Sequence, residues 1–189
     1  MPHIQKRRER QGQKQKGITL LVTAYKVYAS ILNERVKKDI EGKLAEGQFG
    51  FRKGRGAIDA IYVLNYIVNK DLSKKRGKLV ACFIDVKAAF DKVDRKALME
   101  RLEEMEVKEN LRRRITEIYG ETDNMVKIEE RTEEFWTTRG VRQECPLSPT
   151  LFNAFFSDLE EDMNKVQEGG IMIGRKKVRT IVYADDIVL

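Results

Sequence analysis

The sequence has 189 residues, of which 41% are hydrophobic and 35% are charged, so it can form one domain with a small subdomain and a heavily solvated surface. No stretch approaches the roughly 20 apolar residues of a membrane helix, and the N-terminus lacks the apolar run of a signal peptide. Residues 1–17 contain six Lys or Arg and one Glu, and this predicts a basic, disordered arm that binds phosphates non-specifically or only keeps the chain soluble.

The first half of the chain predicts two helices, a loop and a strand. Residues 23–41 have helical spacing of apolar side chains, and the stripe consists of Ala24, Val27, Tyr28, Ile31 and Ile40. Residues 44–56 contain four glycines and indicate an ordered loop, and residues 57–72 resume a helix. The continuous apolar run 79–84 predicts a short strand that is buried on both faces.

The second half predicts two capped helices, a hairpin, a further helix and the C-terminal strands. Asp94 is suited to cap one helix, and a second helix runs from Asn110 to Gly120. Weak alternation over 125–135 indicates a hairpin, and Ser148 followed by proline marks another helix start. Strands at 171–173 and 178–183 complete an α+β pattern in which the strands collect toward the C-terminus.

Carboxylates stand at the ends of two apolar runs. Asp85 ends the run 79–84, and Asp185 and Asp186 form a turn between two further runs. Aspartate is a common turn residue, and that explanation stays open. Adjacent like charges beside a hydrophobic hairpin nevertheless need compensation, which a divalent cation with oxygen ligands provides. If Asp85 lies beside Asp185, the three carboxylates form a site for two Mg²⁺ or Mn²⁺ ions and for nucleotidyl transfer.

Five ordered segments resemble reverse transcriptases of the non-LTR (LINE-type) retrotransposons. Residues 83–93, 140–153 and 183–189 are similar to three central motifs, and residues 18–26 and 47–61 to upstream fingers motifs. The resemblance covers about residues 16–189. It implies the fingers and palm of a right-hand polymerase, with an antiparallel palm sheet backed by helices and truncated before the thumb. Residues 18–78 are then fingers and 79–189 palm, and for part of 107–140 a return to the fingers stays open.

The resemblance also implies roles for individual residues. Metal ligands are expected at Asp85, Asp185, Asp186 and the backbone of Val86, nucleotide contacts at Phe90, Gln143 and Lys16, and template or primer contacts at Arg52, Arg55, Pro146 and Ser148. Phe90 would select dNTP over rNTP, and Pro146 with Ser148 would shape the helix start behind the template base. For Phe90 ordinary core packing remains an alternative, and for the two arginines a solvated loop.

Two positions depart from the family pattern. Glu144 stands where glycine is usual and adds bulk and repulsion near the triphosphate, and Lys16 replaces an arginine and loses its bidentate grip. The sequence ends three residues after Asp186, so we expect the primer-gripping strands, the thumb and an endonuclease module to belong to the rest of the same polypeptide.

Two functions are therefore considered. The first is RNA-directed DNA polymerase, with an RNA template, a DNA primer and dNTP as partners and no membrane. The second is a truncated, inactive remnant with at most non-specific RNA binding. A palm-type cyclase or primase is a weaker third reading, because the fingers motifs oppose it. Two cysteines do not make a disulfide framework, so we expect an intracellular protein, nuclear or cytoplasmic and not secreted.

Overall fold

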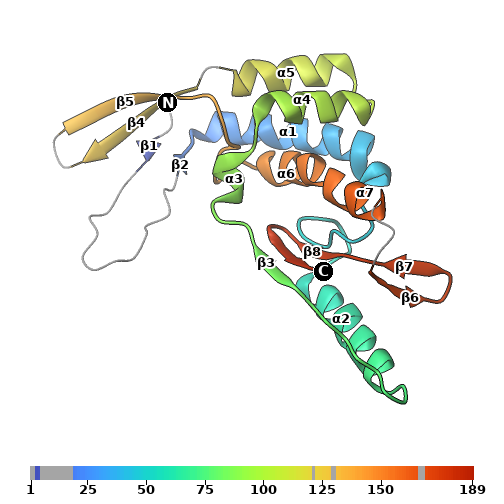
Figure 1. The fold of residues 1–189 in the computed structure, drawn as a ribbon. Coiled ribbons are helices and arrows are strands. Elements are labelled where there is room, and N and C mark those ends of the chain that lie inside the picture. Colours follow the sequence, from blue (N-terminus) through green and yellow to red (C-terminus); the bar gives the residue numbers. More distant parts are fainter. Residues whose placement is uncertain (1–2, 5–18, 121, 129–130, 166–168) are drawn as a thin grey trace. The chain divides into compact units, whose positions relative to one another are not determined.

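The computed structural model describes residues 3–4, 19–120, 122–128, 131–165 and 169–189 (Figure 1). The chain divides into two compact units. Unit 1 consists of Met1–Gly42 and Phe90–Phe155, and unit 2 of Lys43–Ala89 and Phe156–Leu189. Each unit is therefore built from two separate stretches of sequence.

Unit 1 is mainly helical, with one sheet at its side. A four-stranded sheet has the order β2-β1-β4-β5, in which β1 and β4 are parallel. The short α3 begins at the last residue of unit 2, and α6 ends one residue beyond unit 1. The elements are β1 (His3–Ile4), β2 (Thr19–Leu20), α1 (Thr23–Ile40), α3 (Ala89–Lys92), α4 (Arg95–Glu104), α5 (Glu109–Tyr119), β4 (Thr122–Ile128), β5 (Arg131–Thr137) and α6 (Ser148–Phe156).

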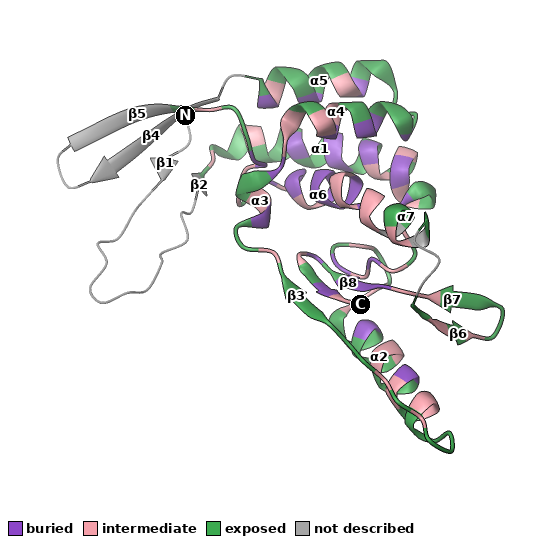
Figure 2. Cartoon of the chain, viewed as in Figure 1, coloured by how far each residue is buried: buried purple, intermediate pink, exposed green. Residues whose placement is uncertain are grey.

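The core of unit 1 forms between α1, α4, α5 and α6, whose buried residues Figure 2 shows in purple. On α1 the buried apolar residues are Ala29, Leu32, Val36 and Ile40, which recur every three or four positions. Of the stripe predicted from the sequence only Ile40 is buried, and Ala24, Val27, Tyr28 and Ile31 are exposed, so the rest of that prediction was wrong. Helical spacing fits both stripes, and tertiary packing selected the one containing Leu32 and Val36.

The predicted cap of α4 and the predicted end of α5 are confirmed. The carboxylate of Asp94 accepts hydrogen bonds from the backbone amides of Lys96 and Ala97 at 2.9 and 3.1 Å, and these bonds lower the pKa of Asp94. α5 ends at Gly120. The Arg95 side chain donates to the carbonyls of Tyr119, Thr137 and Gly140 at 2.6 to 2.9 Å, and so ties the end of α5 to the segment after β5.

Unit 2 combines one long helix with short antiparallel strands. A three-stranded sheet has the order β3-β9-β8, and β6 pairs with β7 separately. The strand predicted over 178–183 is interrupted, so that β7 and β8 are distinct. The elements are the 3₁₀ helix η1 (Glu41–Lys43), whose first two residues belong to unit 1, α2 (Ala57–Leu72), β3 (Phe83–Asp85), α7 (Asp158–Lys165), β6 (Ile171–Ile173), β7 (Lys176–Val178), β8 (Ile181–Tyr183) and β9 (Asp186–Val188).

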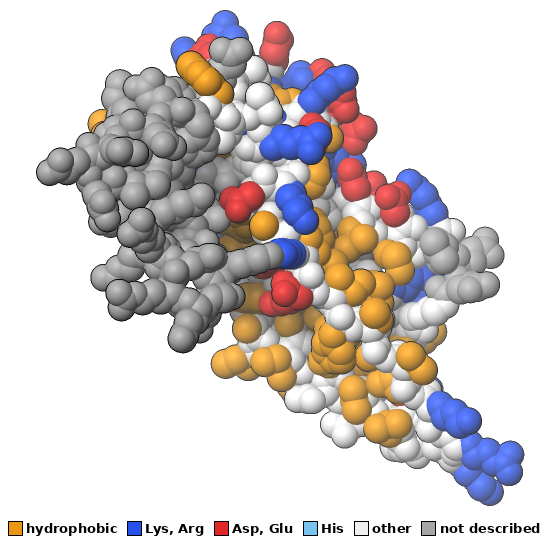
Figure 3. Space-filling model, turned by 60° about the vertical axis from the view of Figure 1, so that its left-hand side comes forward, with side chains coloured by type: hydrophobic (Ala, Val, Ile, Leu, Met, Phe, Trp, Pro, Cys, Tyr) orange, Lys and Arg blue, Asp and Glu red, His pale blue; other side chains and the backbone are white. Residues whose placement is uncertain are grey.

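The core of unit 2 lies between α2 and the sheet. Ala60 and Ile67 of α2 pack with Ile181 of β8, and half-buried apolar residues surround them. The prediction of a strand buried on both faces over 79–84 was wrong. β3 begins only at Phe83, forms the edge of the sheet and has no buried residue. Apolar side chains also remain exposed on α2, and Figure 3 shows such side chains gathered on the lower part of the molecule.

The α+β prediction with an antiparallel palm sheet is confirmed. The assignment of 18–78 to fingers and 79–189 to palm stays a prediction, and the two units are not divided at residue 78. The predicted basic arm, 1–17, lies outside the described residues except for His3–Ile4, which form β1. Within the described ranges, no helix is both long and apolar enough to cross a bilayer.

Candidate active site

Asp85 and Asp186 are direct partners across two antiparallel strands. β3 pairs with β9 so that Asp85 lies opposite Asp186 and Ile84 opposite Ile187. Cys82 and Leu189 exchange both backbone hydrogen bonds at 3.0 Å, so by alternation Asp85 and Asp186 form a non-hydrogen-bonded pair. In such a pair the side chains share one face with Cβ atoms about 5 Å apart. The register therefore brings two carboxylates together from distant parts of the sequence.

The acid pair lies at one end of a sheet face that is apolar at the other end. Tyr183 of β8 pairs with Asp186, so a row of Asp85, Asp186 and Tyr183 crosses the three strands. Two residues back along the strands, Ile181 and Val188 occupy the same face and pack with the α2 core. Val182 and Ile187 on the opposite face are buried as well, so the strand register, and not burial of one face alone, sets the side on which the carboxylates lie.

Asp185 belongs to the turn that joins β8 to β9. The turn has two central residues, Ala184 and Asp185, between the paired Tyr183 and Asp186. Ala184 has φ +57° and Asp185 does not have a positive φ, which is the sign pattern of a type II′ hairpin turn. The backbone amide of Val86 donates to the carbonyl of Asp185 at 3.4 Å, so the first residue after β3 is joined to this turn.

The donor chemistry of the acid pair fits a hard divalent cation. Mg²⁺ is usually held by one or two carboxylates, with water and substrate phosphates completing its shell. Asp85 and Asp186 supply two facing carboxylates, both exposed. Among the residues described, no three or more His, Cys, Asp or Glu side chains are grouped so as to hold a metal. The convergence of all three aspartates on one ion therefore stays a prediction.

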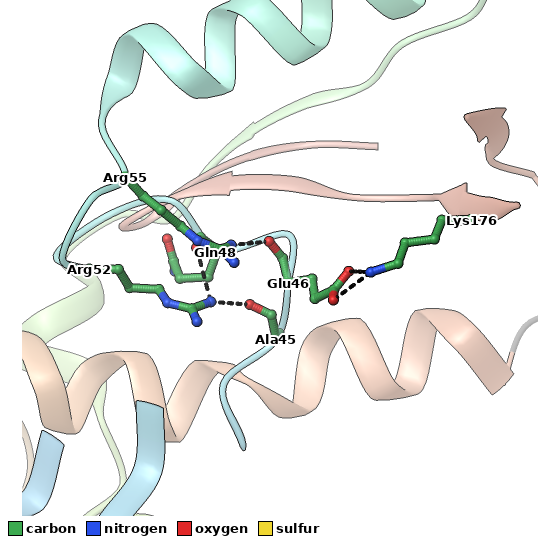
Figure 4. A network of polar contacts seen from close by, with 6 residues as sticks. All are labelled: Ala45, Glu46, Gln48, Arg52, Arg55 and Lys176. Carbon is green, nitrogen blue, oxygen red and sulfur yellow. Dashed lines mark hydrogen bonds and ion pairs between the residues drawn. The ribbon is translucent and has the colours of Figure 1, made fainter. Parts of the chain in front are cut away.

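The glycine-rich loop that follows η1 is held by its own arginines (Figure 4). The guanidinium of Arg52 donates to the carbonyl of Ala45 at 2.7 Å, and that of Arg55 donates to the carbonyl of Glu46. The Glu46 carboxylate binds the Lys176 ammonium at 2.7 Å, and this hydrogen bond lowers the pKa of Glu46. Both arginines thus order the loop, and their contact with a template stays a prediction.

Within unit 1, the segment that contains Phe90 and Asp91 contacts the segment that contains Gln143. The ring of Phe90 stacks on that of Phe152, with 4.8 Å between centroids and 9° between planes. The Gln143 amide donates to a carboxylate oxygen of Asp91 at 3.2 Å, and the Val141 amide donates to the carbonyl of Phe90 at 2.8 Å. The predicted nucleotide contacts at Phe90 and Gln143 therefore belong to one small region, although they come from separate motifs.

Glu144 has φ +63°, a left-handed conformation that glycine adopts without strain. Its side chain is exposed. Glutamate in place of the usual glycine therefore adds bulk and charge, and it also holds a residue with a Cβ in a disfavoured backbone conformation.

Buried hydroxyls surround Cys145 and the start of α6. Ser148 is 1% exposed, and its hydroxyl is 2.8 Å from the Tyr119 hydroxyl. The Tyr25 hydroxyl is 3.4 Å from the sulfur of Cys145, and burial raises the pKa values of Tyr25 and Tyr119. α6 begins at Ser148 itself, so the helix start predicted at Ser148 and the following proline is confirmed. Pro146, half-buried, precedes this start.

Residues 4–189 match the protein family described as reverse transcriptase (RNA-dependent DNA polymerase). The chain belongs to the reverse transcriptase family. The resemblance found in the five sequence segments is thereby confirmed, and the matched region contains the paired aspartates.

The relatives of this reverse transcriptase domain include polyproteins of non-LTR elements. The Pol polyprotein of the type-1 retrotransposable element R2 from Nasonia vitripennis is 27% identical over 91% of this chain, and that from Popillia japonica is 26% identical over 91%. An uncharacterized 149 kDa protein of transposon TX1 from Xenopus laevis is also 26% identical. The chain spans 16%, 24% and 13% of the length of these relatives.

Solved structures support the same fold. Apo telomerase from Candida tropicalis matches with a TM-score of 0.56 and 16% identity over 87% of this chain and 34% of its own. Telomerase from Candida albicans matches with a TM-score of 0.55 and 13% identity over 85% of this chain and 28% of its own. The right-hand polymerase fold predicted from the sequence is confirmed, and the domain is an RNA-directed DNA polymerase by family.

Sequence reasoning identified the acid residues of this reverse transcriptase domain but missed Gln48. Gln48 is 5% exposed and its amide contacts the hairpin that carries Asp185. The signal was its position inside the block 47–61, where a polar residue is flanked by glycine and phenylalanine. Lys16, the predicted triphosphate contact, lies outside the described residues.

Proposed function

We propose that this chain contributes the active centre with which a non-LTR element adds dNTPs to the 3′-OH of a DNA primer along an RNA template. The observation that carries the proposal is the direct pairing of Asp85 with Asp186 on an exposed part of the sheet. Two opposed carboxylates repel one another, and a sheet gains nothing from that arrangement unless a cation occupies it.

Asp85, Asp185 and Asp186 are the proposed ligands of two Mg²⁺ or Mn²⁺ ions, together with the backbone of Val86. Ions held there would supply Lewis-acid chemistry for activating the attacking primer oxygen and stabilising the leaving pyrophosphate. The chain itself supplies part of the geometry, because the β3–β9 register pairs Asp85 with Asp186, and Asp185 directly precedes Asp186 in the two-residue turn.

The remaining residues are proposed to bind the substrates. Phe90, Gln143 and Lys16 contact the nucleotide, and Phe90 excludes the 2′-hydroxyl of an rNTP. Arg52 and Arg55 contact the template or primer, and Pro146 with Ser148 shapes the start of α6 behind the template base. The buried Ser148 hydroxyl supports this indirect role, because it is bound to Tyr119 inside the protein.

An intracellular site of action, nuclear or cytoplasmic, is part of the proposal, and so are thumb and endonuclease modules on the same polypeptide. The alternative is an inactive remnant that binds RNA non-specifically. The intact and paired aspartates favour the polymerase, since a remnant has no need to keep like charges opposed.

The test is primer extension on an RNA template, with the Asp186→Asn variant as blank. Two proteins are compared, namely the chain itself and the chain continued with the following segment of the Nasonia vitripennis R2 polyprotein. Extension above the blank by the continued protein supports the proposal. Mn²⁺ binding without extension in either protein favours the remnant, and equal Mn²⁺ binding by wild type and Asp186→Asn contradicts the proposed metal site.

A further inference from the structure

Gln48 binds both backbone groups of the residue at the tip of the aspartate hairpin. Its side-chain oxygen accepts a hydrogen bond from the Ala184 amide at 3.1 Å, and its side-chain nitrogen donates to the Ala184 carbonyl at 3.3 Å. The same oxygen accepts from the Gly50 amide at 2.8 Å. A buried side-chain amide thus binds both backbone groups of a residue 136 positions away in sequence, and its oxygen also binds the nearby Gly50 amide.

The backbone on either side of Gln48 follows the hairpin. The Val182 amide donates to the carbonyl of Gly47 at 2.8 Å, and the Phe49 amide donates to the carbonyl of Val182 at 2.8 Å. A Cβ on Gly50 would lie 2.4 Å from the Ala184 nitrogen, so only glycine allows this approach. The loop therefore runs along β8 as far as the turn, and Gln48 closes the contact there.

The turn needs such support. The hairpin belongs to the three-stranded sheet, but at its turn Ala184 has a positive φ that alanine disfavours. A strained residue keeps its conformation only when its surroundings determine it, and here the surroundings are the Gln48 amide and the Gly50 backbone. Because Asp185 and Asp186 directly follow Ala184, their positions depend on the same contacts.

We propose that Gln48 is a positioning residue that fixes the Asp185–Asp186 hairpin in its metal-binding geometry. The inference rests on the proposed function for its consequence, since the hairpin matters there as a metal site. The residue type follows from the chemistry. A glutamate has no donor for the Ala184 carbonyl and adds a negative charge, and an asparagine is one methylene shorter. A glutamine reaches both the amide and the carbonyl and stays neutral next to the turn that carries the aspartates.

The test compares Gln48→Met, which keeps the size and removes the amide, with a matched control. Asn33→Leu removes another buried side-chain amide, whose oxygen accepts from the Thr150 hydroxyl at 2.6 Å within unit 1. Two quantities are measured on the whole chain: the hydrogen-exchange rate of the Ala184 amide by NMR, and the dissociation constant for Mn²⁺.

In the wild type the Ala184 amide should exchange slowly. Gln48→Met should speed its exchange at least about tenfold and weaken Mn²⁺ binding by about 10- to 100-fold, the range found for residues that orient metal ligands. Asn33→Leu should lower stability and change neither quantity. A freely exchanging Ala184 amide in the wild type, or an unchanged Mn²⁺ dissociation constant in folded Gln48→Met, overturns the proposal. Equal Mn²⁺ binding by wild type and Asp186→Asn instead overturns the proposed function. In that case the exchange rate of the Ala184 amide still tests whether Gln48 holds the hairpin.

Discussion

Asp85 faces Asp186 across a non-hydrogen-bonded position of the β3–β9 pair, so that two acids separated by 100 residues of sequence share one face of one sheet. Neither residue alone is informative, because aspartate is common at strand ends and in turns. The register brings the two carboxylates together, and like charges directly opposite each other in a sheet are expected to be destabilising when no cation is bound.

Asp186→Asn should remove Mn²⁺ binding and, in metal-free buffer, leave the domain as stable as wild type or more stable by up to about 1 kcal/mol. The gain is expected because like charges directly opposite each other in a sheet are destabilising by roughly that amount. Calorimetric Mn²⁺ titration and urea unfolding measure the two effects. Asp162→Asn, at an exposed acid paired with Lys165 on α7, is the control and should keep Mn²⁺ binding. Lower metal-free stability of Asp186→Asn would show that the pair is not repulsive.

Glu144→Gly should stabilise unit 1 by about 1 kcal/mol. Glu144 has φ +63°, and a residue with a Cβ pays roughly 1–2 kcal/mol there, from which the greater flexibility of glycine in the unfolded chain subtracts part. Urea unfolding gives the free energy. Glu144→Ala is the matched control, because it removes the charge and retains the strained φ, and it should not stabilise. If both variants stabilise equally, the charge and not the backbone was the cause.

The sequence predicted those elements whose signals are local. Asp94 was identified as a cap because an aspartate before a helix accepts the first amides regardless of the rest of the fold, and Gly120 ended α5 for a similarly local reason. The buried side of α1 was not predicted correctly. Two stripes have helical spacing, and the choice of Leu32 and Val36 over Val27 and Ile31 depends on the helices that pack against α1.

Local sequence patterns likewise predicted some residues of the candidate site and missed those that depend on tertiary contacts. Asp85, Asp185 and Asp186 stand out because acids follow apolar runs, and the family motifs supplied their common role. The contact of Gln48 with Ala184 spans 136 residues and has no local pattern, so no spacing rule could predict it. The exposure of β3 was missed for a related reason. An apolar run shows that a strand is favourable, and it does not show how many neighbours that strand has.

Tyr25→Phe should reduce the loss of stability at alkaline pH. Burial raises the folded-state pKa of Tyr25 above the value of about 10 in the unfolded chain. The stability that Tyr25 contributes in its protonated form is therefore fully present below pH 10. As pH rises above 10, the free energy of unfolding should fall by about 1.4 kcal/mol per pH unit. Urea unfolding between pH 8 and 11 should show a shallower decline in the variant. Tyr62→Phe, at an exposed tyrosine of α2, is the control and should follow the wild type.

Phe90→Ala should raise rNTP incorporation relative to dNTP in the continued protein if that protein extends primers. The Phe90 ring is held against Phe152, which is 1% exposed, so its position is fixed from behind by the core. Ratios of single-nucleotide incorporation measure the effect. Leu98→Ala, in the core of α4, is the control for lost stability and should leave the ratio unchanged. A Phe90→Ala variant with lower stability and an unchanged ratio would assign Phe90 to core packing.

Arg55→Gln should weaken RNA binding and lower its dependence on salt. Each phosphate contact contributes about 0.7 to the slope of log affinity against log salt for a single strand, so the loss of one contact should reduce the slope by about that amount. Arg55→Lys keeps the positive charge and should keep the slope. It should also destabilise unit 2, because the Arg55 guanidinium donates to the carbonyl of Glu46 and stacks over Phe49 at 5.7 Å.

Lys53→Gln, at an exposed lysine of the same loop, is the control for a general loss of positive charge. The slopes come from fluorescence anisotropy with a labelled RNA between 50 and about 200 mM salt. A wild-type slope in Arg55→Gln would mean that Arg55 serves only the loop, and an equal loss in Lys53→Gln would mean that the RNA senses charge and not a placed guanidinium.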